Sequence, residues 1–162
     1  RPGDWEIWNN LGNARRLSGD PSGAVGALRR AAGIRSDVAP IQVNLGSALA
    51  DAGDMEAALA AYRRALALAP EDPAIRLDTA RLLRDLRRFE EALDLLRSGT
   101  SGPDELIETG RSLSGLWRLD EAERAYRTVL AMRRDLDEAW LELPLGLGRR
   151  ERRRLSHTRD RV

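Results

Sequence analysis

Few side chains in this chain could take part in catalysis. The single histidine, His157, lies in an arginine-rich stretch, where no rigid surroundings are expected to hold it beside a nucleophile or a metal. The acidic pairs Glu90-Glu91 and Asp120-Glu121 could serve acid–base chemistry, but both fall at the starts of predicted helices, where negative charge interacts favourably with the helix dipole. The chain has no cysteine, so it has no thiol nucleophile. We therefore expect no enzymatic activity, cofactor or metal in this segment.

Positive charge is concentrated near the C-terminus. The whole chain has 27 basic and 26 acidic residues, a net charge of +1. Residues 149–161 carry seven arginines against two acidic residues, so this stretch is +5 and the preceding chain is −4. Such a stretch could contact RNA, DNA or an anionic membrane. No aromatic residue stands among the arginines to stack on bases, so we expect a solvated tail and disfavour nucleic acid as a partner.

A sequence pattern recurs at a fixed interval. Residues 8–14 read WNNLGNA and residues 42–48 read QVNLGSA, so that Asn-Leu-Gly-x-Ala returns after 34 residues. A period of this length is typical of a two-helix unit that stacks on copies of itself to bury its apolar face. Thr79-Ala80 and Thr109-Gly110 mark two further units, of which the third is about four residues short.

Small residues and turn residues stand where paired helices need them. Small side chains recur in register and would let the helix axes approach closely; they are Gly12, Gly46, Ala80 and Gly110 on the first helices and Ala24, Ala58, Ala92 and Ala122 on the second. Gly19-Asp20-Pro21 and Gly53-Asp54 each supply a turn and a helix N-cap. These signals predict eight helices, at residues 5–17, 21–33, 39–52, 55–68, 73–86, 89–98, 103–116 and 120–133.

Over residues 2–143 the sequence resembles the tetratricopeptide repeat family, with four repeats and a partial fifth. The second unit follows the family pattern most closely, at Leu45, Gly46, Ala58, Tyr62, Ala65 and Pro70. The third unit departs most, with Ala80 in place of glycine and Leu96 in place of the aromatic residue. The resemblance implies an all-α fold, a right-handed superhelical solenoid of antiparallel helix pairs.

The repeat register also predicts how the chain is divided. We expect the end of an upstream repeat or a linker at 1–4, repeats at 5–38, 39–72, 73–102 and 103–136, a partial fifth repeat or cap at 137–147, and a disordered arginine-rich tail at 148–162. Pro144 interrupts the fifth repeat, because proline inside a helix removes a hydrogen bond and clashes with the preceding turn. Pro2 stands where an earlier repeat would end, so we expect more repeats upstream.

The resemblance implies that the chain binds proteins. In this family the first helices of the repeats form a concave surface that takes extended peptides. Helical spacing places ten candidate groove residues on that surface: Asn9, Asn13, Asn44, Ser47, Leu77, Asp78, Arg81, Arg84, Glu108 and Arg111. Asparagine amides can hold a peptide backbone without requiring a sequence, although Asn44 could equally satisfy local backbone. Arg81 and Arg111 could capture an anion or be neutralised by the nearby acidic residues Asp78 and Glu108.

The chaperone-binding members of the family grip a terminal carboxylate with basic residues and asparagines. Asn13 and Asn44 match that clamp, but Asn9, Ala74 and Asp78 stand where its basic residues should be. The sequence therefore argues against a carboxylate clamp. We expect instead a scaffold that binds an extended peptide or partner segment.

Alternative roles stay open at the level of sequence. The repeats could be a substrate-docking or regulatory region of a larger bacterial enzyme, since sulfotransferases and glycosyltransferases with similar repeats carry catalytic domains after them. Weak self-association through the terminal repeats is a further alternative. No apolar run approaches the roughly 18 residues that a membrane-spanning helix needs. The cytoplasm is the default location, although a leader could be missing.

Overall fold

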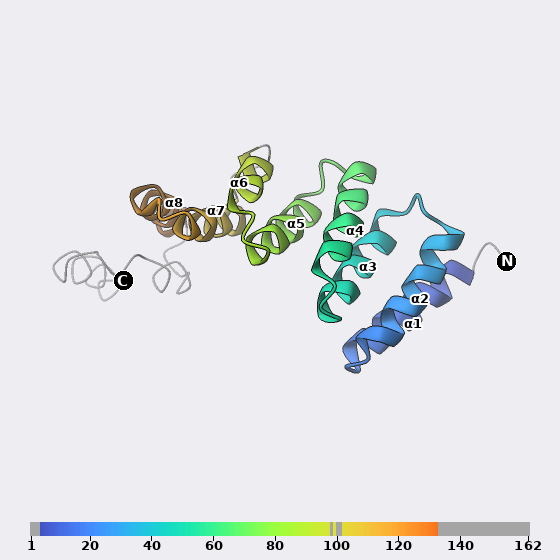
Figure 1. Ribbon diagram of the computed structural model, residues 1–162. Coiled ribbons are helices and arrows are strands. Elements are labelled where there is room, and N and C mark those ends of the chain that lie inside the picture. The colour runs from blue at the N-terminus through green and yellow to red at the C-terminus, as the bar shows by residue number, and fades with distance from the viewer. Residues whose placement is uncertain (1–3, 98, 100–101, 133–162) are drawn as a thin grey trace, which may run out of the picture. The chain divides into compact units, whose positions relative to one another are not determined.

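The computed structural model describes residues 4–97, 99 and 102–132, and this part of the chain forms eight α-helices and no strand (Figure 1). The helices are α1 (Asp4–Leu17), α2 (Pro21–Ile34), α3 (Ala39–Asp51), α4 (Met55–Leu68), α5 (Pro73–Asp85), α6 (Phe89–Arg97), α7 (Pro103–Gly115) and α8 (Leu119–Met132). Each helix end falls within one residue of its predicted position. The partial fifth repeat, the arginine-rich tail and His157 lie outside the described residues.

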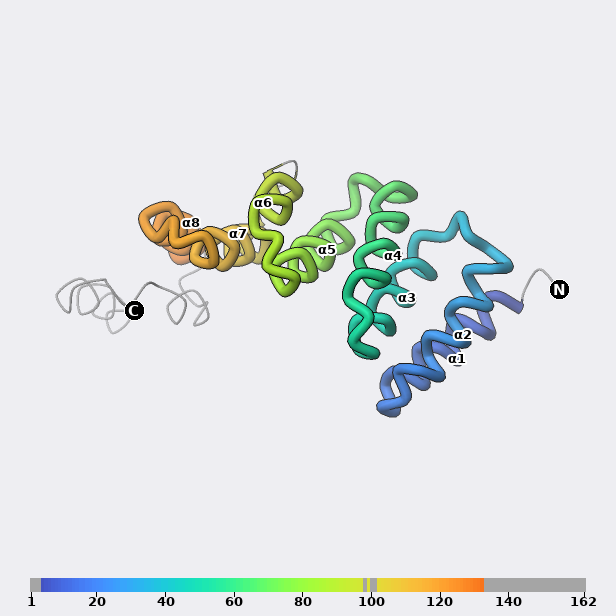
Figure 2. Tube along the Cα trace, in the orientation of Figure 1, coloured from blue at the N-terminus to red at the C-terminus, as the bar shows by residue number. Residues whose placement is uncertain are grey.

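The chain forms two compact units. The first unit is Arg1–Leu86 and contains α1 to α5, and the second is Arg87–Val162 and contains α6 to α8. In the first unit, α1 packs on α2, α2 on α3, α3 on α4, and α4 on α5, and α1 also contacts α3 (Figure 2). In the second unit, α7 packs on both α6 and α8. The boundary falls between α5 and α6, within the predicted third repeat, and the repeat boundaries stay a prediction.

The starts of α2, α5 and α7 follow from proline and aspartate. The carboxylate of Asp20 accepts a hydrogen bond from the Gly23 backbone N–H at 2.8 Å, and that of Asp72 accepts one from the Ala74 N–H at 2.9 Å. These contacts satisfy backbone donors that have no partner inside the helix. Pro21, Pro73 and Pro103 are first-turn residues, where the missing N–H costs nothing.

Three glycines lie at close contacts within the helix pairs. A Cβ atom added to Gly12 would lie 2.5 Å from Leu28 Cγ, one added to Gly46 would lie 3.1 Å from the Tyr62 ring, and one added to Gly110 would lie 2.5 Å from Tyr126 Cε1. A side chain at these positions would push the helices apart. The four alanines predicted to face them from the second helices are all fully buried; they are Ala24, Ala58, Ala92 and Ala122.

Four three-residue turns join the helices at residues 18–20, 52–54, 86–88 and 116–118. The middle residue of each turn has a positive φ, which L-residues with side chains rarely adopt. Gly19 and Gly53 supply that conformation in the first two turns, with φ values of 81° and 84°. Arg87 and Trp117 adopt it in the other two, with φ values of 59° and 60°.

Candidate functional site

The ten predicted groove residues lie in both units. Eight of them are in the first unit, where α1 carries two, α3 two and α5 four; these are Asn9, Asn13, Asn44, Ser47, Leu77, Asp78, Arg81 and Arg84. Glu108 and Arg111 lie on α7 in the second unit. Each group is therefore described within its own unit.

Two asparagine side chains join α1 to α3. Asn44 Nδ2 donates a hydrogen bond to Asn9 Oδ1 at 2.9 Å, and both side chains are half-buried. Asn13, one turn further along α1, has a buried side-chain oxygen that accepts no hydrogen bond from the described residues. A buried acceptor without a donor costs free energy, so the Asn13 oxygen is an unsatisfied polar group beside the Asn9–Asn44 contact.

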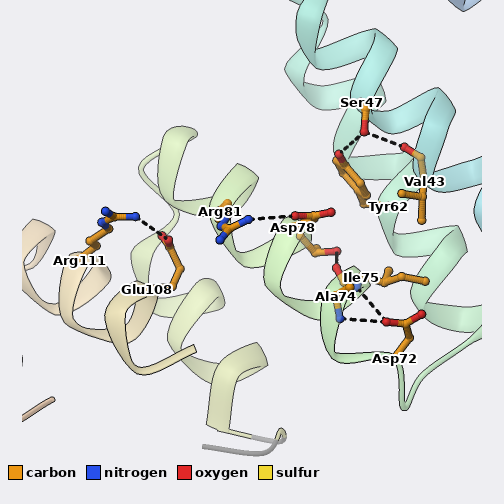
Figure 3. Close-up of polar contacts among 11 residues, drawn as sticks. Val43, Ser47, Tyr62, Asp72, Ala74, Ile75, Asp78, Arg81, Glu108 and Arg111 are labelled. Carbon is orange, nitrogen blue, oxygen red and sulfur yellow. Dashed lines mark hydrogen bonds and ion pairs between the residues drawn. The ribbon is translucent and has the colours of Figure 1, made fainter. Parts of the chain in front are cut away.

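Tyr62 of α4 reaches the same face of the first unit through α3. Its ring packs on Gly46, and its hydroxyl lies 2.9 Å from Ser47 Oγ (Figure 3). Ser47 Oγ also donates to the Val43 carbonyl oxygen at 3.1 Å. Either hydroxyl can be the donor in the contact between Ser47 and Tyr62.

The surroundings of Tyr62 shift its acidity. Burial raises the pKa of Tyr62 above its ordinary value, and the hydrogen bond with Ser47 lowers it in part. The carboxylate of Asp78 raises this pKa further, and Arg16 lowers it. Tyr62 thus lies within electrostatic range of charges on α1 and α5. From the sequence, Tyr62 is predicted only as a residue of the family pattern, because its spacing does not distinguish a packing role from a surface role.

The arginines of the first unit's site are paired with neighbouring carboxylates. Arg81 Nη1 lies 3.3 Å from Asp78 Oδ1, as Figure 3 shows, and Arg84 Nη2 lies 2.9 Å from Asp85 Oδ1. Arg16, which the prediction omitted, bridges α1 and α3 through a 3.2 Å contact with Asp51. Of the two alternatives for Arg81, anion capture and neutralisation by nearby carboxylates, the contact with Asp78 favours neutralisation.

In the second unit, Glu108 is placed differently from its prediction as a groove residue. Its side chain is 1 % exposed, and Arg111 Nη1 lies 3.7 Å from its Oε2 atom (Figure 3). A buried carboxylate needs a charged or hydrogen-bonding partner, and Arg111 supplies the charge. Spacing alone misplaced Glu108, because helical periodicity gives a residue's direction but not how closely its neighbours cover it.

No cluster of three or more histidine, cysteine, aspartate or glutamate side chains suited to a metal ion occurs within residues 4–97, 99 and 102–132. Across the same residues, no helix has the length and apolar character needed to cross a membrane.

Comparisons with known proteins agree with this fold. A family model described as tetratricopeptide repeat matches residues 43–105. A crystal structure of MamA superposes with a TM-score of 0.77 at 17% identity, covering 91% of this chain and 89% of that chain. MamA from Desulfovibrio magneticus RS-1 superposes with a TM-score of 0.81 at 16% identity, covering 96% of this chain and 90% of that chain.

A third similar structure is PilF from Pseudomonas aeruginosa, with a TM-score of 0.74 at 20% identity, covering 86% of this chain and 65% of that chain. A comparison with curated proteins found no match. At these identities the structures share the fold alone, and they confirm the predicted all-α repeat solenoid as the fold class. The family match over residues 43–105 and the glycine-centred helix pairs agree with the predicted resemblance of this chain to the tetratricopeptide repeat family.

Proposed function

We propose that the face of the first unit formed by α1, α3 and α5 binds an extended segment of a partner protein. The observation that carries the proposal is the Asn9–Asn44 amide contact beside the unpartnered Asn13 oxygen. These three side chains come from two helices and lie on the face that α1 and α3 share. The segment itself is proposed to be a scaffold without catalytic activity.

The amide groups suit recognition of a peptide backbone. Asn44 Nδ2 uses one of its two N–H groups on Asn9, and among the described residues the remaining N–H and the Asn44 side-chain oxygen have no partner, so both are available to a ligand. The contact between the two side chains also fixes their rotamers, which lowers the entropy that a ligand would have to remove. A peptide N–H directed at Asn13 Oδ1 would satisfy the buried acceptor.

The charge pattern favours neutral backbone over a terminal carboxylate as the ligand. Three arginines on these helices form ion pairs with aspartate side chains: Arg16 with Asp51, Arg81 with Asp78, and Arg84 with Asp85. A carboxylate ligand would have to displace one of these pairs. This agrees with the absence of the basic clamp residues from the sequence.

Peptide selection can test the proposal. Extended peptides would be selected from a displayed random library against the wild-type chain, and the affinities of Asn9→Ala, Asn13→Ala and Asn44→Ala variants would then be measured by titration calorimetry. Loss of a hydrogen-bonding amide should weaken binding by about tenfold. The matched control is Ser22→Ala on the exposed side of α2. Selected peptides that bind all three asparagine variants as tightly as the Ser22 control would refute the proposal.

A further inference from the structure

A second groove lies in the first unit between α2 and α4, with α3 as its floor. Its volume is about 420 Å³, within the range of pockets that bind ligands. Small residues on the two flanking helices create the space; they include Ala32 and Gly33 on α2 and Ala57, Ala60 and Ala61 on α4. Leu45 and Leu49 of α3 supply an apolar floor.

This groove lies on a different face from the proposed peptide site. Gln42 of α3 lines it, whereas Asn44, two residues later, points to α1. Two residues correspond to about 200° of rotation around a helix, so the two side chains project from nearly opposite sides of α3. Ligands could therefore occupy the two faces independently.

Gln42 gives the floor of the groove an unsatisfied polar group. The side chain is 2 % exposed, and its Oε1 atom accepts no hydrogen bond from the described part of the chain. Buried side-chain oxygens are normally hydrogen-bonded, so this acceptor favours a ligand with an N–H or O–H donor. A peptide backbone N–H meets that requirement.

Two arginines line the same groove. Arg29 comes from α2 and Arg64 from α4, and both are exposed. Within residues 4–97, 99 and 102–132, neither has an ion pair or a side-chain hydrogen bond. They differ in this from Arg16, Arg81 and Arg84, which are paired on the opposite face. Guanidinium groups without partners bind carboxylates strongly, because two parallel N–H groups match the two oxygens.

We propose that the groove between α2 and α4 binds an acidic peptide segment, whose carboxylates pair with Arg29 and Arg64. An apolar side chain of the segment packs on Leu45 and Leu49, and a backbone N–H of the segment donates to Gln42. The two arginines give charge complementarity, and the amide at the floor selects a peptide over a small inorganic anion.

The test uses a fluorescein-labelled peptide of alternating glutamate and leucine, titrated with the whole chain and followed by fluorescence anisotropy. The same peptide with glutamine in place of glutamate is the neutral probe. Saturable binding of the acidic probe is expected, about tenfold or more tighter than binding of the neutral probe. Absence of saturable binding, or equal binding of the two probes, would overturn the proposal.

Three variants locate the binding. The double variant Arg29→Gln/Arg64→Gln keeps long, helix-favouring side chains, and it should weaken binding of the acidic probe by about tenfold or more. Ala60→Leu fills the groove while both arginines remain, and it should also weaken binding of the acidic probe. Arg124→Gln, an exposed arginine on α8, is the charge control and should leave binding unchanged. Circular dichroism confirms that each variant is folded.

If the acidic probe binds, two results would still overturn its assignment to the groove between α2 and α4. Equal losses in Arg124→Gln and the Arg29/Arg64 variant would mean that the probe responds only to net charge. Self-association in sedimentation that Ala60→Leu abolishes, without an effect of that variant on the probe, would show that a second copy of the chain occupies the groove.

Discussion

The hairpin of α3 and α4 in the first unit and that of α7 and α8 in the second have the same backbone plan but different side chains. Both turns have three residues, and both have a hydrogen bond from the third turn residue back to the helix: Asp54 N to Leu49 O at 2.9 Å, and Arg118 N to Leu113 O at 3.0 Å. The first turn uses Gly53 at the positive-φ position, and the second uses Trp117. The same geometry is therefore reached with and without the residue that prefers it.

The residues that precede α4 and α8 also differ: an aspartate caps α4, and an arginine stands before α8. Asp54 accepts a hydrogen bond from the Ala57 backbone N–H at 3.3 Å, which is the usual role of an N-cap aspartate. At the equivalent place before α8 stands Arg118, which instead donates two hydrogen bonds, each 2.7 Å long, to the carboxylate of Glu121. Before α6, Arg88 makes the same contact with Glu91.

What the hairpins share is the tight contact of glycine with tyrosine. Gly46 faces Tyr62, and Gly110 faces Tyr126. Interhelical packing, and not ideal turn chemistry, therefore holds the hairpin geometry. In the second unit this packing compensates for a residue in an unfavourable conformation.

The largest effect is expected from filling the glycine contact. Gly110→Val should lower the free energy of unfolding by about 3 kcal/mol, because its Cβ would lie 2.5 Å from the fully buried ring of Tyr126. Gly46→Val should cost about 1–2 kcal/mol, because the corresponding distance to Tyr62 is 3.1 Å. Urea denaturation followed by circular dichroism measures both values.

Gly26→Val is the matched control for this pair. Gly26 lies in α2 with nothing within 4 Å of an added Cβ, so the same substitution should change stability by less than about 0.5 kcal/mol. If Gly110→Val cost no more than Gly26→Val, the shared helix contact would not be what holds the hairpins together.

Exchanging the turn residues should give effects of opposite sign. Trp117→Gly should raise the free energy of unfolding by about 1 kcal/mol, because glycine adopts a positive φ without a steric penalty. Gly53→Ala should lower it by about 1 kcal/mol for the converse reason. Thermal and urea unfolding of the two variants checks the signs. A loss of stability in Trp117→Gly would show that the tryptophan side chain makes a stabilising contact that outweighs backbone strain.

The smallest effect concerns the ion pair that replaces the aspartate cap. The hydrogen bond from Arg118 holds the pKa of Glu121 below its ordinary value. Because the folded-state pKa is lower than the unfolded one, the stabilisation is present above the ordinary glutamate pKa of about 4.3 and is lost as the pH falls through the folded-state value. Glu121→Gln should remove that part of the acid dependence, as measured by urea unfolding at neutral and acidic pH. An acid dependence identical to that of the wild type would contradict this role.

The helices were predictable from sequence because their signals are local. Aspartates before α2, α4 and α5, with prolines as the first residues of α2 and α5, fix the starts of these helices, and the small residues at the 34-residue interval fix the pairing. The turns before α6 and α8 were predicted in position but not in mechanism, because neither Arg87 nor Trp117 is a turn residue by type.

The candidate site was predictable only in part. Asn9 and Asn44 were placed on one surface by spacing, and the structure brings their amides together. The burial of Glu108 and the contact of Tyr62 with Ser47 depend on neighbours far away in the sequence, which periodicity does not describe. The groove beside Gln42 also arises from three helices at once, so no single motif indicates it.

The proposed partner segment lies along α1 and α3 and contacts their asparagine amides. The chain has four asparagines, Asn9, Asn10, Asn13 and Asn44, and one glutamine, Gln42. Its side-chain amide NMR signals can therefore be assigned individually, and they report separately on the two proposed binding faces. Titration of the isotope-labelled chain with a selected extended peptide should shift the amide signals of Asn9, Asn13 and Asn44 and leave that of Gln42 in place. Saturating peptide that leaves those three amides unmoved would contradict the account.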